Sequence, residues 1–356
     1  MGVLPTNCVF SERGGILENK HDIHAAVVDT NGALLYSVGN PSRVTLARST
    51  AKPAQALAIL ETGALDQFGF DDADIALMCA SHNSENAQVL RATRMLCKVQ
   101  AQEQDLQCGG HASLSETVNA GWIRAGLVPT AIHNNCSGKH AGMIGGAKAL
   151  TTRGDGYHLP EHPMQVRVQR VFSELSGLDA RDIKWGIDGC NLPAPALPLL
   201  NLARVYCCLA ASADEAEVPG AAPESRTQHL SCIFRAMVQH PELVAGQGRF
   251  CTALMKAYRG AVMGKLGADG CYGVSVRASE QTNALGAGGA IGIAVKVEDG
   301  NIGILYSAVV EILQQLGIGT TAIWETLEEY HRPKLVNTAG VVTGSLQFGF
   351  RVQRAP

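Results

Sequence analysis

The sequence predicts a mixed α/β (α+β) fold: an antiparallel sheet made from both ends of the chain, flanking helices, and an inserted helical region. Three observations lead to this prediction. Strand-like apolar segments lie near both termini, and helix-like segments fill the middle of the chain. The composition, with 46% hydrophobic and 17% charged residues, is that of a compact globular protein.

The N-terminal strands are predicted from a hairpin signal. Apolar residues at 25–28 and 33–36 flank Asn31 and Gly32, a dipeptide that favours the tight turn of a hairpin. The hairpin is therefore expected over residues 24–38.

The middle of the chain is predicted to be helical. Apolar residues recur there every three or four positions, and Gly or Pro lies near the ends of several segments. The expected helices are 52–62, 85–98, 141–150, one within 160–175, 196–209, 227–240 and 248–258.

Strands return near the C-terminus, at 272–277 and 290–297, followed by an amphipathic helix at 301–316 and an alternating segment at 341–352. We therefore expect one folded unit of residues 1–356. It would have a sheet subdomain of about 1–45 and 262–356 and a helical subdomain of about 46–261.

Charge and cysteine usage exclude several classes of function. The 29 basic and 32 acidic residues give a net charge of −3 without any basic run, so we expect no nucleic-acid or membrane partner. No apolar stretch is long enough to span a membrane, and we expect no signal peptide, because the N-terminal residues lack a basic region followed by an apolar one. Eleven scattered cysteines, an odd number, favour free thiols in a reducing compartment, which predicts a cytoplasmic location.

Three short patterns occur in an order that is typical of serine acyl-transfer enzymes of the β-lactamase and penicillin-binding type. They are, along the chain, Ser49-x-x-Lys52, Ser81-x-Asn83 and Lys265-x-Gly267. A serine becomes nucleophilic when a base takes its proton, and a lysine can be that base when its surroundings favour the neutral amine. The spacing at a helix start places Ser49 and Lys52 on one face. The alternative for Ser49 is a helix cap, because Pro53 follows within the first turn.

Four longer blocks resemble the signature blocks of the Rhizobium etli-type L-asparaginases. They are residues 47–56, 79–85, 135–143 and 188–193, and the resemblance extends from Arg13 to Gly344. It implies a fold like that of serine β-lactamases and glutaminases, and a homodimer. It also implies hydrolysis of L-asparagine to L-aspartate and ammonia, with a Zn²⁺ ion close to the active site.

The resemblance also implies roles for individual residues. The matching Ser–Lys pairs are Ser49 with Lys52 and Ser81 with Lys265. Arg48 and Asp188 match residues beside the substrate, where the Arg48 fork could hold a carboxylate and Asp188 an ammonium group. The matching metal ligands are Cys136, Lys139 and Cys190.

The residues by themselves leave several alternatives open. Ser81 could be a second or the principal nucleophile, or only a helix cap, and Asp188 could be a turn residue because Gly189 follows it. From chemistry alone, His140 would be the ordinary third zinc ligand after two thiolates, because a lysine must first lose its proton. The alternative functions are another serine hydrolase of this fold (a glutaminase, or an amidase for β-lactams or peptides) and a non-catalytic zinc-binding scaffold.

Overall fold

The computed structural model describes residues 7–150 and 154–356. The chain divides into two compact units. The first, here the sheet unit, contains residues up to Thr50, Leu197–Ala211 and Ala253–Pro356. The second, the helical unit, contains Ala51–Ala196 and Ser212–Thr252.

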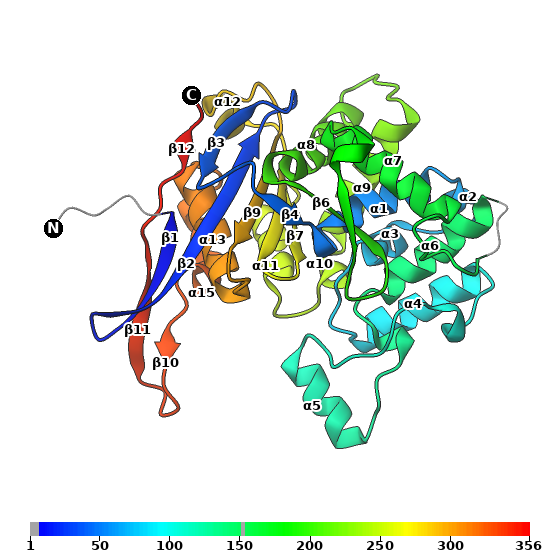
Figure 1. Ribbon diagram of the computed structural model, residues 1–356, viewed down its shortest axis with the longest axis horizontal. Helices are drawn as coiled ribbons and strands as arrows, with labels where there is room; N and C mark the ends of the chain where they lie inside the picture. Colours follow the sequence, from blue (N-terminus) through cyan, green and yellow to red (C-terminus); the bar gives the residue numbers. More distant parts are fainter. Residues whose placement is uncertain (1–6, 151–153) are drawn as a thin grey trace. The chain divides into compact units, whose positions relative to one another are not determined.

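The sheet unit is built on antiparallel strands from both ends of the chain. They are β1 (Cys8–Arg13), β2 (Ile16–Val28), β3 (Leu34–Val38), β7 (Val262–Gly267), β8 (Cys271–Val276), β9 (Ile291–Val297), β10 (Leu335–Val336), β11 (Val342–Phe348) and β12 (Gln353–Arg354). In the described part of the chain these nine strands form one sheet in the order β10-β11-β1-β2-β9-β8-β7, and β3 pairs with both β2 and β12 (Figure 1). Strand β4 (Val44–Leu46) leads from this sheet toward the first helices.

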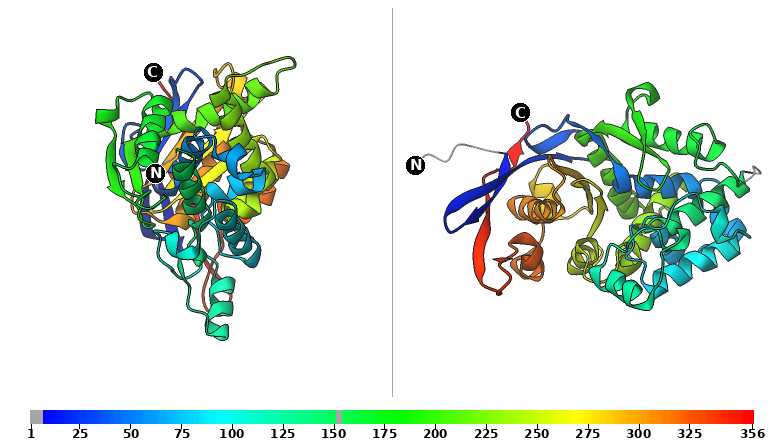
Figure 2. Two further views of the ribbon diagram at one scale, coloured as in Figure 1. Left: turned by 90° about the vertical axis from the view of Figure 1, so that its right-hand side faces the viewer. Right: turned by 60° about the horizontal axis from the view of Figure 1, so that its bottom comes forward.

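Helices cover both faces of the central strands β8 and β9. The helices of this unit are α8 (Leu199–Ala216), α11 (Phe250–Tyr258), α12 (Glu280–Ala284), α13 (Ile302–Gln315), α14 (Thr321–Thr326) and α15 (Glu328–His331), of which α8 and α11 belong to it only in part. On one face Ser275 donates a hydrogen bond to the Tyr206 carbonyl of α8, at 2.6 Å. On the other, Tyr272 meets Tyr306 of α13 with ring centroids 6.4 Å apart. Because strand residues alternate between faces, β8 and β9 are buried on both sides. Figure 2 shows the sheet curling around α13 and α15.

The helical unit packs around two almost completely buried helices, α1 and α6. Its elements are α1 (Lys52–Leu60), α2 (Ala64–Phe68), α3 (Asp72–Met78), α4 (Asn86–Lys98), α5 (Glu116–Ala125), α6 (Ser137–Ala149), α7 (Pro163–Ser176), α9 (Ser225–Gln239), α10 (Pro241–Val244) and the strand pair β5 (Lys184–Ile187) and β6 (Pro193–Pro198). Short 3-10 turns are η1 (Arg48–Ala51), η2 (Glu103–Asp105), η3 (Ala131–His133) and η4 (Ala180–Asp182).

Glycines bring α6 close to α3. A Cβ atom at Gly138 would lie 2.6 Å from the Leu77 carbonyl oxygen, and one at Gly142 would lie 2.8 Å from Met78 Cγ. A side chain at Gly138 would need a shift of the backbone, and one at Gly142 a shift of the Met78 side chain. The close approach places the end of α3, which leads into Ser81, beside the first turn of α6.

The predicted fold class is confirmed: terminal segments form the antiparallel sheet, and helices fill the middle of the chain. Two boundaries differ from expectation. Helix α6 begins at Ser137 rather than 141, so the polar block before it is partly helical. Residues 193–198 form β6 before α8 begins at Leu199, because prolines at 195 and 198 disfavour helix there. Strands β1 and β5 and helix α5 were not predicted, because their apolar periodicity is weak.

The division into units differs from the expected subdomains mainly at residues 197–211. Residues 199–211 of α8 belong to the sheet unit, since the small residues Gly273 and Gly292 leave room for them against β8 and β9. In the described residues, no helix combines the length and the apolar character needed to cross a membrane.

Candidate active site

Ser49 lies half-buried on the 3-10 turn η1, directly before α1. The cap of α1 is Ala51, so Ser49 is not the helix cap that its position allowed. The turn is tied to α8 because the Tyr206 hydroxyl donates a hydrogen bond to the Thr50 carbonyl at 2.8 Å. Ser49 is thus held on a fixed backbone without capping the helix that follows.

Lys52 is the first residue of α1 and is fully buried. Its amino group donates hydrogen bonds to the Ala80 carbonyl and to Ser81 Oγ, the latter at 3.0 Å. The lysine expected to serve Ser49 is therefore in direct contact with the second candidate serine. This contact joins the first two short patterns of the sequence into one arrangement.

The Ser81 loop is fixed by hydrogen bonds to the loop before α6. The backbone N–H of His82 donates to the Asn135 carbonyl at 3.1 Å. The His82 ring accepts from the Ser84 N–H at Nδ1, 3.0 Å away, so Nε2 carries the proton and donates to Ser137 Oγ at 3.0 Å. Burial, reinforced by the charge of Lys52, lowers the pKa of His82 to about 3. His82 is therefore a neutral structural residue.

Asn83, the last residue of the second short pattern, is engaged by protein groups. Its amide donates to Glu85 Oε1 at 2.9 Å and to the Gln247 carbonyl at 3.2 Å, and accepts from Arg249 at 2.7 Å. These bonds tie the Ser81 loop to the segment after α10. The asparagine acts here as a brace for the loop.

Lys265 lies on β7 and is buried. Its amino group donates to the carbonyl of the next residue, Leu266, at 2.7 Å. Gly267 of the same pattern lies against the Ser49 turn: a Cβ atom there would be 2.7 Å from the Ala47 carbonyl oxygen and 3.0 Å from Thr50 Cγ2. The glycine of the third pattern therefore allows β7 to approach η1.

The three expected metal ligands come together with Asp188 in the helical unit. Lys139 Nζ lies 2.9 Å from Cys190 Sγ and 3.1 Å from Asp188 Oδ2. Cys136 precedes α6, and its sulfur lies 2.8 Å from Asn135 Oδ1. Asp188 Oδ1 also accepts from the backbone N–H groups of Cys190 and Leu192, at 2.9 and 3.0 Å. Asp188 thus both shapes the turn after β5 and pairs with Lys139.

The charges of this cluster stabilise one another. Burial disfavours the ammonium of Lys139, but its electrostatic interactions with Cys190, Asp188 and Cys136 outweigh burial and raise its pKa. Burial likewise opposes ionisation of Asp188, but Lys139 and the two backbone N–H groups lower its pKa below the usual range. A hydrogen bond from Cys190 lowers the pKa of Cys136, and the same contact raises the pKa of Cys190.

His140, the alternative metal ligand, makes a different contact. The Tyr157 hydroxyl accepts from the Gln107 N–H at 2.9 Å and lies 2.6 Å from His140 Nδ1. Burial lowers the pKa of His140 well below its usual value, so the ring is neutral. His140 is buried, and Nε2 has no partner within the part of the chain that the structure describes. The ring is thus held at Nδ1 by Tyr157.

In residues 7–150 and 154–356, no group of three or more His, Cys, Asp or Glu is arranged to hold a metal ion. The expected ligands are two cysteines and a lysine. Because lysine is not one of these four residue types, the expected set is not such a group. The zinc ion therefore stays a prediction at this point.

Arg48 begins η1 with a left-handed backbone, at φ 52°. Its guanidinium pairs with Asp269, in the turn between β7 and β8. No sequence pattern pointed to Asp269, because it lies in none of the blocks that carry the resemblance.

The model of a family described as L-asparaginase II matches residues 9–348. The chain belongs to the L-asparaginase II family. The comparison with curated proteins gave no match. Among solved structures, a probable glutaminase of Bacillus subtilis resembles the chain with a TM-score of 0.37 and 12% identity, over 83% of this chain and 89% of that one.

Membership of the family confirms the recognition made from the sequence blocks, and it identifies the chain as an amidohydrolase that acts on amide C–N bonds. The roles of the individual residues stay predictions. Of the expected residues, the structure joins Lys52 to Ser81, and Lys139 to Asp188 and Cys190. Two supporting contacts escaped sequence reasoning: the tie from Tyr206 to the Ser49 turn and the Asp269 partner of Arg48.

Proposed function

We propose that this member of the family is an L-asparaginase, which hydrolyses the side-chain amide of L-asparagine to L-aspartate and ammonia. The observation that carries the proposal is that the buried amino group of Lys52 lies 3.0 Å from Ser81 Oγ. Lys52 is also only three residues after Ser49 in the chain. A Ser–Lys arrangement of this kind suits acyl transfer to a serine, followed by hydrolysis of the acyl-enzyme.

Ser49 is proposed as the nucleophile that attacks the amide carbon, with Lys52 taking its proton. Ser81, in contact with Lys52, would then pass a proton toward the departing ammonia, assisted by Lys265. The same contact supports the reverse assignment, in which Lys52 activates Ser81. Substitution of each serine decides between the two.

Arg48 and Asp188 are proposed to bind the two charged groups of the amino acid. Arg48 offers a planar guanidinium for the α-carboxylate. Asp188 is the proposed partner of the α-ammonium, although it already forms an ion pair with Lys139, whose Nζ lies 3.1 Å from Asp188 Oδ2. The substrate ammonium would therefore bind Asp188 best when Lys139 is uncharged.

A zinc ion fits the donor types at the cluster of Cys136, Lys139 and Cys190. Two sulfur atoms and one amine nitrogen are donors that zinc accepts, and Cys136 has the thiolate character that a ligand needs. When bound, zinc would supply a fixed positive charge near the substrate. Lys139 as a ligand must be neutral, so Asp188 would then lose its ion-pair partner.

The assembly and location are proposed on weaker support. The resemblance implies a homodimer, which light scattering of the purified protein would detect. All eleven cysteines lie in the described residues, and none forms a disulfide. Free thiols throughout the chain support the proposal of a reducing, cytoplasmic compartment.

The function is tested by measuring ammonia release from L-asparagine and L-glutamine. Ser49→Ala is expected to lower the rate on asparagine by about 10³-fold or more, as for other catalytic nucleophiles, while circular dichroism and the melting temperature stay unchanged. Ser225→Ala, at an exposed serine in the same chain, is the matched control.

Each other outcome has a definite meaning. An active Ser49→Ala with an inactive Ser81→Ala moves the nucleophile to Ser81. Activity in both variants rejects serine acyl transfer. Wild-type activity on glutamine alone makes the protein a glutaminase, and no ammonia from either amide favours the non-catalytic scaffold.

A further inference from the structure

The turn between β7 and β8 carries an exposed carboxylate on a rigid backbone. Asp269 and Gly270 both have left-handed conformations, with φ of 56° and 74°, as in the tight turns that join antiparallel strands. The Asp269 residue is open to solvent, and its side chain is 73% exposed. Such an exposed acid would ordinarily be a solvated turn residue.

The backbone of this turn is clamped to the end of β9. The Val297 N–H donates to the Gly270 carbonyl at 2.8 Å, and a Cβ atom at Gly270 would lie 2.8 Å from the Val297 carbonyl oxygen. Gly300 packs against the Asp269 backbone in the same way, since a Cβ there would be 3.3 Å from Asp269 Cα. The turn therefore has little freedom to move.

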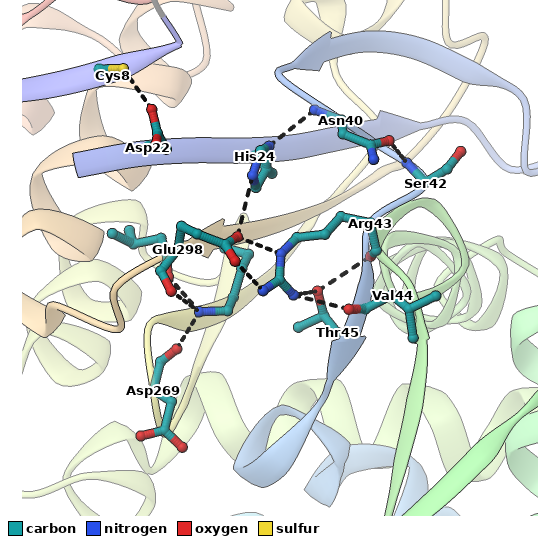
Figure 3. Close-up of polar contacts among 12 residues, drawn as sticks. Cys8, Asp22, His24, Asn40, Ser42, Arg43, Val44, Thr45, Asp269 and Glu298 are labelled. Carbon is teal, nitrogen blue, oxygen red and sulfur yellow. Dashed lines mark hydrogen bonds and ion pairs between the residues drawn. The ribbon is translucent and has the colours of Figure 1, made fainter. Parts of the chain in front are cut away.

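A buried lysine adds a second clamp. Lys296 is 7% exposed, and its amino group donates to the Asp269 carbonyl at 2.7 Å and to the Val297 carbonyl. Nearby, Glu298 makes a two-point ion pair with Arg43, at 2.6 and 2.8 Å. Figure 3 shows the Asp269 carbonyl in this network, with its carboxylate pointing away from Arg43 and Glu298. The network holds the backbone and leaves the carboxylate free for another partner.

That partner is Arg48, the residue directly before Ser49. Its Nη1 donates to Asp269 Oδ2, and its side chain is only 26% exposed. Among the described residues, Nη1 is the only guanidinium nitrogen of Arg48 with a hydrogen-bond acceptor. The Nε and Nη2 edge is therefore open, and this edge can bind a second carboxylate through two parallel hydrogen bonds.

We propose that Asp269 is a positioning residue for the reaction: it fixes the Arg48 guanidinium from one side so that the open edge receives the substrate α-carboxylate. The inference rests on the proposed function, because it needs an amino-acid substrate. A long arginine side chain loses much rotamer freedom on binding, and a partner already in place lowers that cost. Because the pair is half-exposed, its effect on affinity is expected to be modest.

The test is steady-state kinetics of Asp269→Asn on L-asparagine. The substitution keeps the shape of the side chain and removes its charge. We expect KM to rise by about threefold to tenfold with kcat within about twofold of wild type, the size of effect given by a partly exposed ion pair. Asp269→Glu, which keeps the charge, is expected to lie close to wild type. Glu18→Gln, which removes the exposed pair with Arg13 in the same unit, is the matched control.

A double-substitution cycle shows whether Asp269 acts through Arg48. In an Arg48→Lys background, Asp269→Asn is expected to change KM little further, because lysine lacks the two-edged fork. The rate at which phenylglyoxal modifies Arg48, read by mass spectrometry, gives a second measurement. This rate is expected to rise in Asp269→Asn.

Four results overturn the proposal. An unchanged KM in Asp269→Asn rejects a positioning role, and a lower KM shows that Asp269 obstructs the substrate carboxylate. An equal KM increase in the Arg48→Lys background shows that Asp269 acts independently of Arg48. If the wild type releases no ammonia from asparagine, the proposed function fails and this inference fails with it. If the wild type is active, the results for the Asp269 variants test the positioning role alone.

Discussion

Lys139 is suited to two chemical roles, as an ammonium in an ion pair and as a neutral metal ligand. As the structure stands, it is an ammonium between a carboxylate and a thiol, and its pKa is raised. As a zinc ligand it would have to give up that proton. The residue type in the sequence is the same in both cases, so only its neighbours decide between them.

Zinc binding is therefore expected to release protons. Calorimetric titration of the metal-free protein in buffers of different ionisation enthalpy should show at least one proton released per zinc near neutral pH, because Lys139 starts protonated. Affinity should rise with pH for the same reason. Cys136→Ser and Cys190→Ser should bind zinc at least about tenfold more weakly. Cys97→Ser, at an exposed cysteine, is the control. Zinc binding without proton release would contradict Lys139 as a ligand.

The Lys139–Asp188 pair should also matter for stability, since the two side chains are only 1% and 7% exposed. Asp188→Asn leaves a buried ammonium without its carboxylate and is expected to cost about 3–5 kcal/mol of unfolding free energy in denaturant titrations. Asp179→Asn, which removes the exposed ion pair with Arg181, should change the unfolding free energy little.

The sign of the pH dependence follows from the lowered pKa of Asp188. A depressed carboxyl pKa stabilises the folded state above the ordinary value, near pH 4, and this stabilisation is lost as pH falls through the folded-state value. The difference between wild type and Asp188→Asn should be constant from about pH 5 to 9 and should shrink below about pH 4. A difference that grows toward low pH would contradict the pair.

At the scale of elements, close approaches of backbone position the candidate residues. Gly138 allows α6 to pack closely against α3, and Gly267 allows β7 to pack closely against the Ser49 turn. The sequence predicted most helices and the central strands from apolar periodicity, because those elements bury one or both faces. It did not predict α5, which has no buried residue in the described chain, or β6, which is rich in proline.

Gly267→Ala should separate activity from stability. Its Cβ atom would lie 2.7 Å from the Ala47 carbonyl oxygen, so the turn carrying Ser49 or strand β7 must shift. We expect kcat to fall by about tenfold to a hundredfold, as for a misplacement of about 1 Å at a reacting group, with a melting temperature lower by only a few degrees. Gly121→Ala, whose Cβ would meet nothing within 4 Å, is the control. Wild-type kcat in Gly267→Ala would show that the turn tolerates the shift.

At the scale of the whole molecule, the candidate residues are divided between the two units. Arg48, Ser49 and Lys265 belong to the sheet unit, whereas the candidate ligands, Lys52, Ser81 and Asp188 belong to the helical unit. The chain passes between the units at residues 50–51, 196–197, 211–212 and 252–253. The local patterns from which helices and strands were predicted do not indicate where the chain passes from one unit to the other. The assignment of α8 mainly to the sheet unit therefore came only from the structure.

Cysteine chemistry gives a test that involves the entire chain. Thiol titration in guanidinium without reductant should find eleven free thiols, because no disulfide links any of them. In the native protein one thiol should react first, since Cys97 is exposed and eight cysteines are buried. Cys97→Ser should remove that fast phase. Fewer than eleven thiols after denaturation would contradict the reducing compartment.

The sequence by itself determined the family and the strands at both ends of the chain, and it predicted which residue types carry the chemistry. These features are local: they depend on periodicity and on short blocks of residues. The tertiary structure alone decided the partner of each charged group: Ser81 for Lys52, Asp188 for Lys139 and Asp269 for Arg48, separated by 29, 49 and 221 residues along the chain. Local patterns do not encode contacts over such separations, because burial and the paths of the elements bring these groups together.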